Sequence, residues 1–123
     1  MKTLLTGARV WLESHTFAQS CDILIEDNTV IAMGDDCKGT KADQVVDLQG
    51  MTLLPGLIDG HTHGRIGYDF DSATEEQMKE MKLDYARHGV TAVFATLASA
   101  TVEQWITAIE NMEKSGYEGI HLE

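Results

Sequence analysis

The residues best suited to chemistry in this sequence are two histidines, His61 and His63, in the segment LLPGLIDGHTHG at residues 53–64. In a β-strand the side chains alternate between two faces, so residues two apart point the same way. Two neutral imidazoles on one face of a strand end can bind one zinc or iron ion. Asp59 lies two residues before His61, and on the same predicted face its carboxylate could orient a ligand. The spacing therefore predicts a metal site.

An H-x-H pair by itself is a weak signal, because two such histidines are more often structural than metal ligands. Here the pair follows Pro55-Gly56 and the apolar step Leu57-Ile58, which together indicate a sharp turn into a strand. Polar groups buried without partners are costly, and a bound ion would satisfy these ones. The context favours a metal site over structural histidines.

The elements that position this pair alternate between strand and helix. The predicted strands are residues 57–63, 90–97 and 117–123. Helices are expected to begin at Thr74 and Thr101, because each is followed three residues later by a glutamine, the capping-box pattern. Gly89 and Gly116 are placed to end them. The order βαβαβ predicts the opening of a parallel α/β fold. No glycine-rich phosphate loop follows the first strand, which disfavours a dinucleotide site.

The first 52 residues have a different pattern, made of short strand-like runs. These runs are residues 4–12, 22–26, 29–33, 45–48 and 51–54. Turn-forming residues at 26–28 and at Gln49-Gly50 predict two hairpins. His15 lies in a polar stretch and is assigned to a surface loop, and Trp11 is assigned to a core or interface. We expect no chemistry from this portion.

Composition limits the class of protein. The chain has 123 residues, enough for one small domain, and 43% of them are hydrophobic, which argues against disorder. The net charge is −11 and the basic residues are scattered, which predicts no nucleic-acid partner. No apolar run is long enough to span a membrane. Cys21 and Cys37 lack metal-type spacing and predict free thiols in a reducing compartment. We therefore expect a cytoplasmic protein.

Two motifs resemble a known family. The segment PGLIDGHTHG at residues 55–64 resembles the first barrel strand of the amidohydrolase superfamily, and GIHLE at residues 119–123 is similar to the third strand of its N-acetylglucosamine-6-phosphate deacetylases. The resemblance implies that residues 53–123 are the first three strands and two helices of an incomplete (β/α)8 barrel. It implies that residues 1–52 are part of a small β-sandwich. In such barrels the active site lies at the carboxyl ends of the strands.

The resemblance also implies a function. His61, His63 and Glu123 would be ligands of one or two divalent ions, zinc or iron. The full enzyme, a homodimer, would deacetylate N-acetylglucosamine 6-phosphate to glucosamine 6-phosphate and acetate. The general acid/base and the groups that bind the sugar phosphate would lie beyond Glu123, so no catalytic or other cofactor-binding residue is assigned here. We expect the chain alone to be inactive.

Several alternatives stay open. The first motif also fits an N-acetylgalactosamine-6-phosphate deacetylase or a dihydropyrimidinase-like ring opener. A different class is a non-catalytic fragment that only associates with protein. Among the remaining polar residues, Arg65 is expected to pair with Asp69 or Asp71 at the surface. His88 is expected to complement a helix dipole, and His121 to pack in the barrel.

Overall fold

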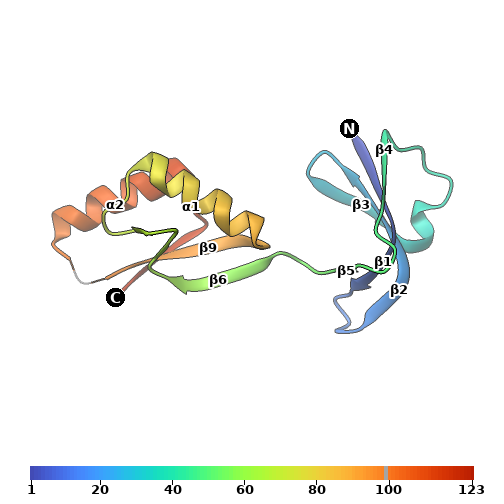
Figure 1. Ribbon diagram of the computed structural model, residues 1–123, viewed down its shortest axis with the longest axis horizontal. Coiled ribbons are helices and arrows are strands. Elements are labelled where there is room, and N and C mark those ends of the chain that lie inside the picture. Colours follow the sequence, from blue (N-terminus) through green and yellow to red (C-terminus); the bar gives the residue numbers. More distant parts are fainter. Residues whose placement is uncertain (99) are drawn as a thin grey trace. The chain divides into compact units, whose positions relative to one another are not determined.

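A computed structural model describes residues 1–98 and 100–123, which form two compact units, Met1–Pro55 and Gly56–Glu123 (Figure 1). The division falls three residues after the boundary predicted from the sequence. The first unit contains β1 (Lys2–Trp11), β2 (Phe17–Glu26), β3 (Thr29–Met33), the 3-10 helix η1 (Gly34–Cys37), β4 (Gln44–Asp47) and β5 (Thr52–Leu53). The second contains β6 (Leu57–Thr62), β7 (Gly64–Arg65), β8 (Tyr68–Asp69), α1 (Glu75–Arg87), β9 (Val90–Leu97), α2 (Val102–Ser115) and β10 (Gly119–Leu122).

The first unit is built on one mixed sheet. Its strand order is β3-β2-β1-β4, and β5 also pairs with β1. The β2–β3 hairpin predicted around residues 26–28 is confirmed, with Asp27 at a φ of 53° in the turn. A small apolar core lies on this sheet, formed by Ala8, Val10, Cys21 and Ile23 with partly buried neighbours. The thiols of Cys21 and Cys37 are free, as predicted. The second sheet of a sandwich remains a prediction.

The hairpin expected at Gln49-Gly50 is wrong. Strands β4 and β5 do not pair with each other, because each runs parallel to β1, at residues 3–6 and 9–10 respectively. The loop between them crosses the irregularity in β1 at Gly7, and the backbone bonds Leu48 N to Thr6 O and Arg9 N to Met51 O continue the pairing on either side. Gln49 and Gly50 do form a turn. After this turn the chain continues along the same edge of β1 and does not reverse its direction.

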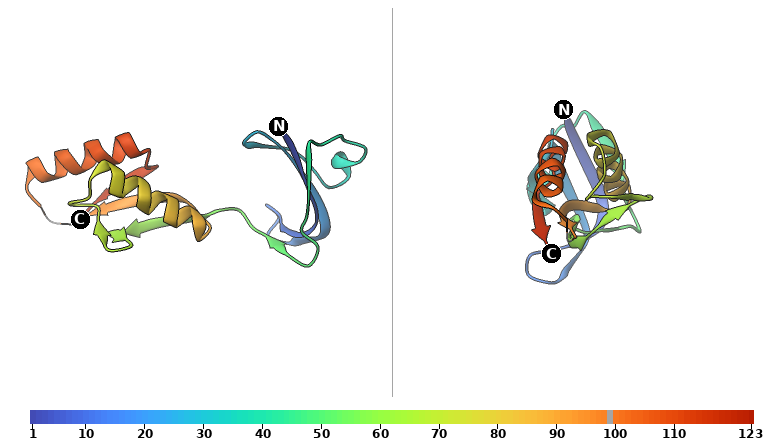
Figure 2. Two further views of the ribbon diagram at one scale, coloured as in Figure 1. Left: turned by 45° about the horizontal axis from the view of Figure 1, so that its top comes forward. Right: turned by 90° about the vertical axis from the view of Figure 1, so that its left-hand side faces the viewer.

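The second unit is a βαβαβ unit with three parallel strands in the order β10-β9-β6. Both helices lie on one face of this sheet (Figures 1 and 2). Between them and the sheet lies the larger core, which is made of Phe70, Ala73, Met78, Met81, Tyr85, Val93, Ala95, Leu97, Ala108 and Met112. The predicted βαβαβ order is confirmed.

Local signals placed both helices correctly. Thr74 with Gln77 and Thr101 with Gln104 form complete capping boxes. Gly116 caps the end of α2 in the left-handed conformation, at a φ of 71°. On α2, Met112 is buried whereas Val102 is largely exposed.

The face of the β10-β9-β6 sheet that the helices leave uncovered carries apolar side chains. Phe94 on β9 and Ile58 on β6 are exposed on this face, whereas Ile120 and Leu122 on β10 are exposed at the strand edge, on the side of the core residues Ala95 and Leu97. Among the described residues of the second unit, no element packs over this face. Three parallel strands with bare outer edges agree with the start of a larger parallel fold, and the full barrel remains a prediction. No helix in the described part of the chain is long and apolar enough to cross a membrane.

A short hairpin, β7–β8, directly follows the histidines. Gly64 pairs with Asp69, and Arg65 pairs with Tyr68. The two residues between the strands, Ile66 and Gly67, have φ values of 50° and 87°, as a type I′ turn requires. The sequence hid this hairpin because isoleucine is unfavourable at such a position.

Candidate metal centre

Three predicted ligands converge in the second unit. The Nε2 atoms of His61 and His63 lie 3.5 and 3.3 Å from the same carboxylate oxygen, Oε2 of Glu123. One ligand atom from each of the three residues fits within 4.8 Å of the others. The side chains are about half exposed, so the cluster opens to solvent. This geometry matches a set of donors around one small cation.

Parallel pairing brings these residues together from distant parts of the chain. His61 lies near the carboxyl end of β6, His63 directly follows that strand, and Glu123 directly follows β10. Both strands flank β9, and the bond from Glu123 N to Leu97 O (3.0 Å) extends the β9–β10 ladder by one residue. The carboxyl ends of parallel strands meet at one sheet edge, so the three side chains share that edge.

Strand β6 contains a bulge immediately before the site. Between the pairs Asp59–Val93 and Thr62–Ala95, three steps on β6 face two steps on β9. Asp59 and Thr62 are consequently the half-buried residues here, whereas His61 is exposed. The Asp59 carboxylate accepts a bond from the backbone N–H of His61 (3.2 Å), not from its ring. The expectation that side chains alternate strictly from Asp59 through His63 is therefore wrong. The Asp59 carboxylate binds the backbone of His61 and does not orient its ring.

Buried hydroxyl groups hold the segment that carries the histidines. Thr62 Oγ1 lies 2.7 Å from the hydroxyl of Tyr85 on α1, which also lies 3.1 Å from the carbonyl oxygen of Gly64. The N–H of Thr62 donates to Oγ1 of Thr96 on β9 (3.1 Å). Burial raises the pKa of the Tyr85 hydroxyl, which keeps it a proton donor. No sequence pattern predicted these contacts.

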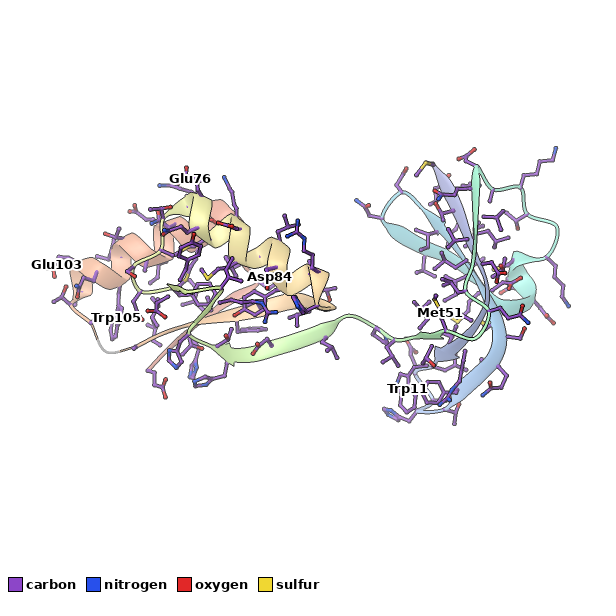
Figure 3. The ribbon with its side chains drawn as sticks, in the orientation of Figure 1. Trp11, Met51, Glu76, Asp84, Glu103 and Trp105 are labelled. Atoms are coloured by element: carbon purple, nitrogen blue, oxygen red, sulfur yellow. The ribbon has the colours of Figure 1, made fainter. Side chains whose placement is uncertain are left out.

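Arg65 has a different partner from the one expected. Its guanidinium forms a close ion pair with Asp84 of α1 and lies 4.8 Å from the centre of the Tyr85 ring. Asp84 is labelled in Figure 3. The hydrogen bond from Arg65 holds the pKa of Asp84 below its ordinary value. Asp84 also lies 3.5 Å from Nδ1 of His88, the residue that caps α1. The predicted pairing of Arg65 with Asp69 or Asp71 is wrong, because helix α1 offers the nearer carboxylate.

His121 was expected to pack in the barrel, but it lies at the candidate metal centre. Its ring makes an edge contact with the ring of His61, with the centroids 4.8 Å apart, and its side chain is exposed. The ring of His61 also contacts that of His63, at 5.3 Å. Three imidazoles thus line the sheet edge, two of them within reach of Glu123.

The donor set fits a divalent metal ion. Two imidazole nitrogens and one carboxylate leave a position for water or substrate, as in three-ligand hydrolytic zinc sites, and the same donors suit iron. The close Nε2 atoms are the ones that would bind, so the ring protons belong on Nδ1. Among the described residues, this is the only such cluster of histidine, cysteine and carboxylate side chains.

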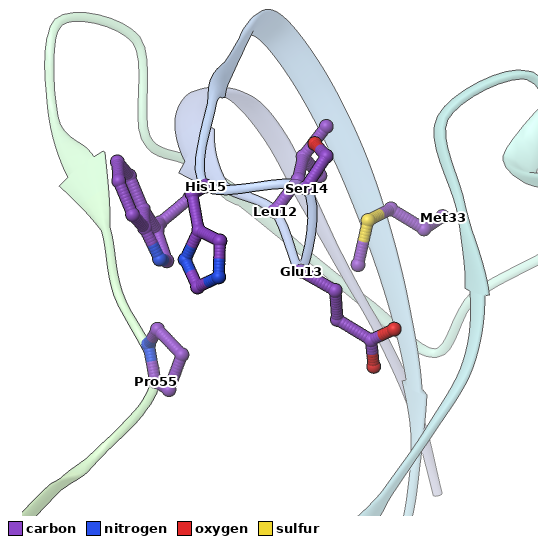
Figure 4. A pocket seen from close by; sticks show the side chains of 7 residues that line it. Leu12, Glu13, Ser14, His15, Met33 and Pro55 are labelled. Carbon is purple, nitrogen blue, oxygen red and sulfur yellow. The ribbon is translucent and has the colours of Figure 1, made fainter.

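A hollow in the first unit is a weaker candidate for a functional site than the metal centre. It has a volume of about 550 Å³ (Figure 4). Its lining consists of Trp11, Leu12, Glu13, Ser14, His15, Met33 and Pro55. The lining is largely apolar, and no group of three metal-binding side chains among the described residues includes His15. The surface-loop position predicted for His15 agrees with this structure.

Comparison with known proteins agrees with this geometry. No family model matches the chain. The N-acetylglucosamine-6-phosphate deacetylase of Vibrio furnissii is 30% identical over 109 residues, which cover 89% of this chain. This chain is a relative of the N-acetylglucosamine-6-phosphate deacetylases. The resemblance found in the two motifs is confirmed, and it is consistent with an amino-terminal portion of an amidohydrolase.

Solved structures extend the relationship to the fold. The deacetylase of Mycobacterium smegmatis, in complex with N-acetyl-D-glucosamine-6-phosphate, matches 98% of this chain with 28% identity and a TM-score of 0.82. The atrazine chlorohydrolase of Arthrobacter aurescens, complexed with zinc, matches 98% with 20% identity and a TM-score of 0.65, a likeness of fold alone.

This deacetylase relative also resembles other hydrolases, and it is much shorter than the proteins it matches. A dihydroorotase of Syntrophotalea carbinolica is 35% identical over 94 residues, or 76% of the chain. The chain spans 27% of the Vibrio deacetylase, 21% of that dihydroorotase and 32% of the Mycobacterium structure. The relatives are hydrolases of the amidohydrolase superfamily, and this chain spans about a third of their length or less.

Proposed function

We propose that this chain supplies the metal-binding first part of a hydrolase that removes the acetyl group from N-acetylglucosamine 6-phosphate. The observation that carries the proposal is the convergence of His61, His63 and Glu123 at one sheet edge. The deacetylase relatives support the choice of substrate. The complete enzyme would be a (β/α)8 barrel and a homodimer.

The chain's own residues would each have a simple task. His61 and His63 offer ring nitrogens to the ion, and the Glu123 carboxylate offsets part of its charge. A bound divalent ion lowers the pKa of coordinated water from about 15.7 towards about 7 and polarises an amide carbonyl. The second oxygen of Glu123 leaves room for a second ion. The half-exposed position of all three side chains leaves the ion accessible to a substrate.

Zinc binding by the chain tests this proposal. We expect zinc titrated into the purified chain to bind tightly, and the His61→Ala/His63→Ala variant to lose that binding. A matched control is His15→Ala/His88→Ala, which removes two histidines that lie outside the cluster, and it should bind zinc like the unsubstituted chain. Equal zinc content in all three proteins, or none in the unsubstituted chain, would contradict the proposal.

A second candidate is the opening of a cyclic amide, favoured by the 35% identity to a dihydroorotase. The same three ligands would serve either reaction, so the substrate must decide. Cobalt in the site broadens the NMR signals of a ligand that lies beside it. Because the groups that would bind the sugar phosphate lie outside this chain, the sample is the complete enzyme. We expect the cobalt-loaded complete enzyme to broaden the acetyl methyl signal of N-acetylglucosamine 6-phosphate more than the ring signals of dihydroorotate. The opposite preference would favour the ring-opening reaction.

A further inference from the structure

We propose that the hydroxyl of Tyr85 is a positioning group for the metal centre and sets the spacing of His61 and His63 through the backbone between them. The inference rests on the proposed metal site and names a residue that does not touch the ion. Tyr85 is 2% exposed and belongs to α1, on the helix-covered side of the sheet. The histidines lie at the opposite, open side.

The contacts of Tyr85 fall on both sides of His63. Its hydroxyl oxygen lies 2.7 Å from Oγ1 of Thr62, the residue between the two histidines. It also lies 3.1 Å from the carbonyl oxygen of Gly64, the residue after His63. One phenol therefore contacts the residues that flank the second ligand, and a shift of that phenol would move both.

The hydroxyl oxygens of Tyr85 and Thr62 lie only 2.7 Å apart, so one of them must donate a hydrogen bond to the other. Either Tyr85 donates to the Gly64 carbonyl and Thr62 donates to Tyr85, or Thr62 donates to that carbonyl (3.4 Å) and Tyr85 donates to Thr62. Both arrangements satisfy the carbonyl with one proton and link the two hydroxyls. If either hydroxyl is removed, only the other can still donate a hydrogen bond to the Gly64 carbonyl.

The bulge in β6 explains why the segment needs such support. A regular strand holds its backbone through ladder bonds, but the ladder is irregular between Asp59 and Thr62. The N–H of Thr62 is bonded instead by the side chain of Thr96. The His63 carbonyl accepts from the N–H of Phe70 at 2.9 Å. Side chains from α1 and β9 thus replace part of the ladder where the ligands must be placed.

A purely structural hydroxyl is the simpler explanation, and the chain contains a matched example of one. Tyr117 is also largely buried, and its hydroxyl donates to the carbonyl of Met78 at 2.7 Å. Burial raises the pKa of both phenols, and both are proton donors. Met78 is distant in sequence from all three metal ligands, and no contact joins Tyr117 to them. Tyr117→Phe therefore removes a comparable bond without touching the ligand segment.

The test compares zinc affinity, the visible spectrum of the cobalt-loaded protein and the thermal midpoint in the full chain. We expect Tyr85→Phe to weaken zinc binding by roughly 10- to 100-fold, the range seen when the partners of metal ligands are removed. It should also shift the cobalt bands, which report ligand geometry. Tyr117→Phe should lower the thermal midpoint and leave zinc affinity and cobalt bands unchanged.

Substitutions at Thr62 keep the inference testable if Tyr85→Phe fails to fold. Thr62→Val removes the linked hydroxyl at nearly constant volume and should weaken zinc binding as Tyr85→Phe does, whereas Thr62→Ser should restore affinity. The inference is overturned if Tyr85→Phe or Thr62→Val binds zinc as tightly as the unsubstituted chain, with the same cobalt spectrum. Absence of zinc binding in the unsubstituted chain would instead overturn the metal site itself, and the inference with it.

Discussion

At the scale of single residues, the site depends on where side chains are forbidden as well as where they bind. Gly64 follows His63 at a φ of 154°, and a Cβ built there would lie 2.0 Å from the carbonyl oxygen of Tyr68. The contacting atom belongs to the backbone of β8, so the hairpin itself would have to move to admit a side chain at residue 64. Gly60 precedes His61, and a Cβ built there meets nothing within 4 Å. The two glycines that frame the histidines thus have different reasons to be there.

We expect Gly64→Ala to lower the free energy of unfolding by about 2 kcal/mol or more, because the hairpin backbone must move to admit the methyl group. It should also weaken zinc binding, since Gly64 carries the carbonyl that Tyr85 contacts. Chemical denaturation and zinc titration measure the two effects. Gly60→Ala is the matched control and should leave both close to those of the unsubstituted chain. Equal behaviour of the two variants would contradict this account.

The metal ligands themselves were predictable because their signal is local or carried by a family motif. His61 and His63 stand two apart at a strand end, and Glu123 was assigned through the resemblance of its motif. The hydroxyl contacts of Tyr85 were not predictable. They depend on a bulge that changes which residues face the helix, and a single sequence gives no local mark of that bulge.

At the scale of elements, helices were easier to predict than strand pairing. The capping boxes at Thr74 and Thr101 lie within four residues, so the sequence alone locates both helix starts. Pairing joins residues far apart, which is why β4 and β5 were taken for a hairpin although both pair with β1. The β7–β8 hairpin was missed because its turn contains Ile66 where asparagine or glycine is usual.

The backbone strain at Ile66, in the turn of the β7–β8 hairpin, can be relieved by substitution. Ile66 is β-branched and has a φ of 50°, a conformation that costs non-glycine residues about 1–3 kcal/mol. We expect Ile66→Asn to raise the free energy of unfolding by about 1 kcal/mol, measured by denaturant titration. Ile66→Val keeps the branched side chain and should give no gain. If Ile66→Asn instead lowers the free energy of unfolding, the contacts of the isoleucine side chain stabilise the fold by more than its backbone strain destabilises it.

One ion pair at the start of β10 predicts a pH effect. Burial acts to raise the pKa of Glu118, but the backbone N–H of Val93 (3.0 Å) and the Lys82 ammonium (3.1 Å) outweigh it and lower that pKa. A carboxyl with a lowered pKa in the folded state stabilises the fold above its ordinary pKa, near roughly 4.3, and loses that contribution as pH falls through the folded value.

We therefore expect Glu118→Gln to lower the thermal midpoint at neutral pH and to differ progressively less from the unsubstituted chain as the solution is acidified. Thermal unfolding followed at a series of pH values between neutral and about 3 measures this. Glu80→Gln, an exposed change on α1, is the control and should show a small difference. A gap for Glu118→Gln that stays constant with pH would contradict the assignment.

At the scale of the whole molecule, the uncovered sheet face dominates behaviour in solution. Strands β6 and β10 each have one neighbour in the described chain, and apolar side chains lie exposed on them. Open edges with apolar surface favour pairing with other chains. The three predicted ligands lie at one edge of this same sheet, so whatever covers the face also borders the site.

We expect the chain by itself to self-associate, and Ile58→Lys or Leu122→Lys to shift its mass towards that of a monomer in light scattering. Leu83→Lys is the matched control, because Leu83 is similarly exposed, at 54%, but lies on α1 away from the sheet. A monomeric chain with one sharp unfolding transition would contradict the expectation.

We also expect no release of acetate from N-acetylglucosamine 6-phosphate by the chain alone, even when zinc is bound. Three ligands place an ion, but hydrolysis also needs a group that moves protons, and none is assigned among these residues. Acetate measured by a coupled assay gives the answer. Turnover that is lost in His61→Ala/His63→Ala would show that the chain holds a complete catalytic apparatus.

The spacing of the ligands along the chain has a consequence for biosynthesis. Glu123 follows His63 by 60 residues, while β9 lies between their strands in the sheet. A ribosome needs roughly 3 to 12 seconds to add that length at typical rates of elongation. If the proposed site is correct, the nascent chain offers only its two histidines to a metal during this interval. The carboxylate would join them afterwards, and we therefore expect the identity of the bound ion to depend on exchange after synthesis.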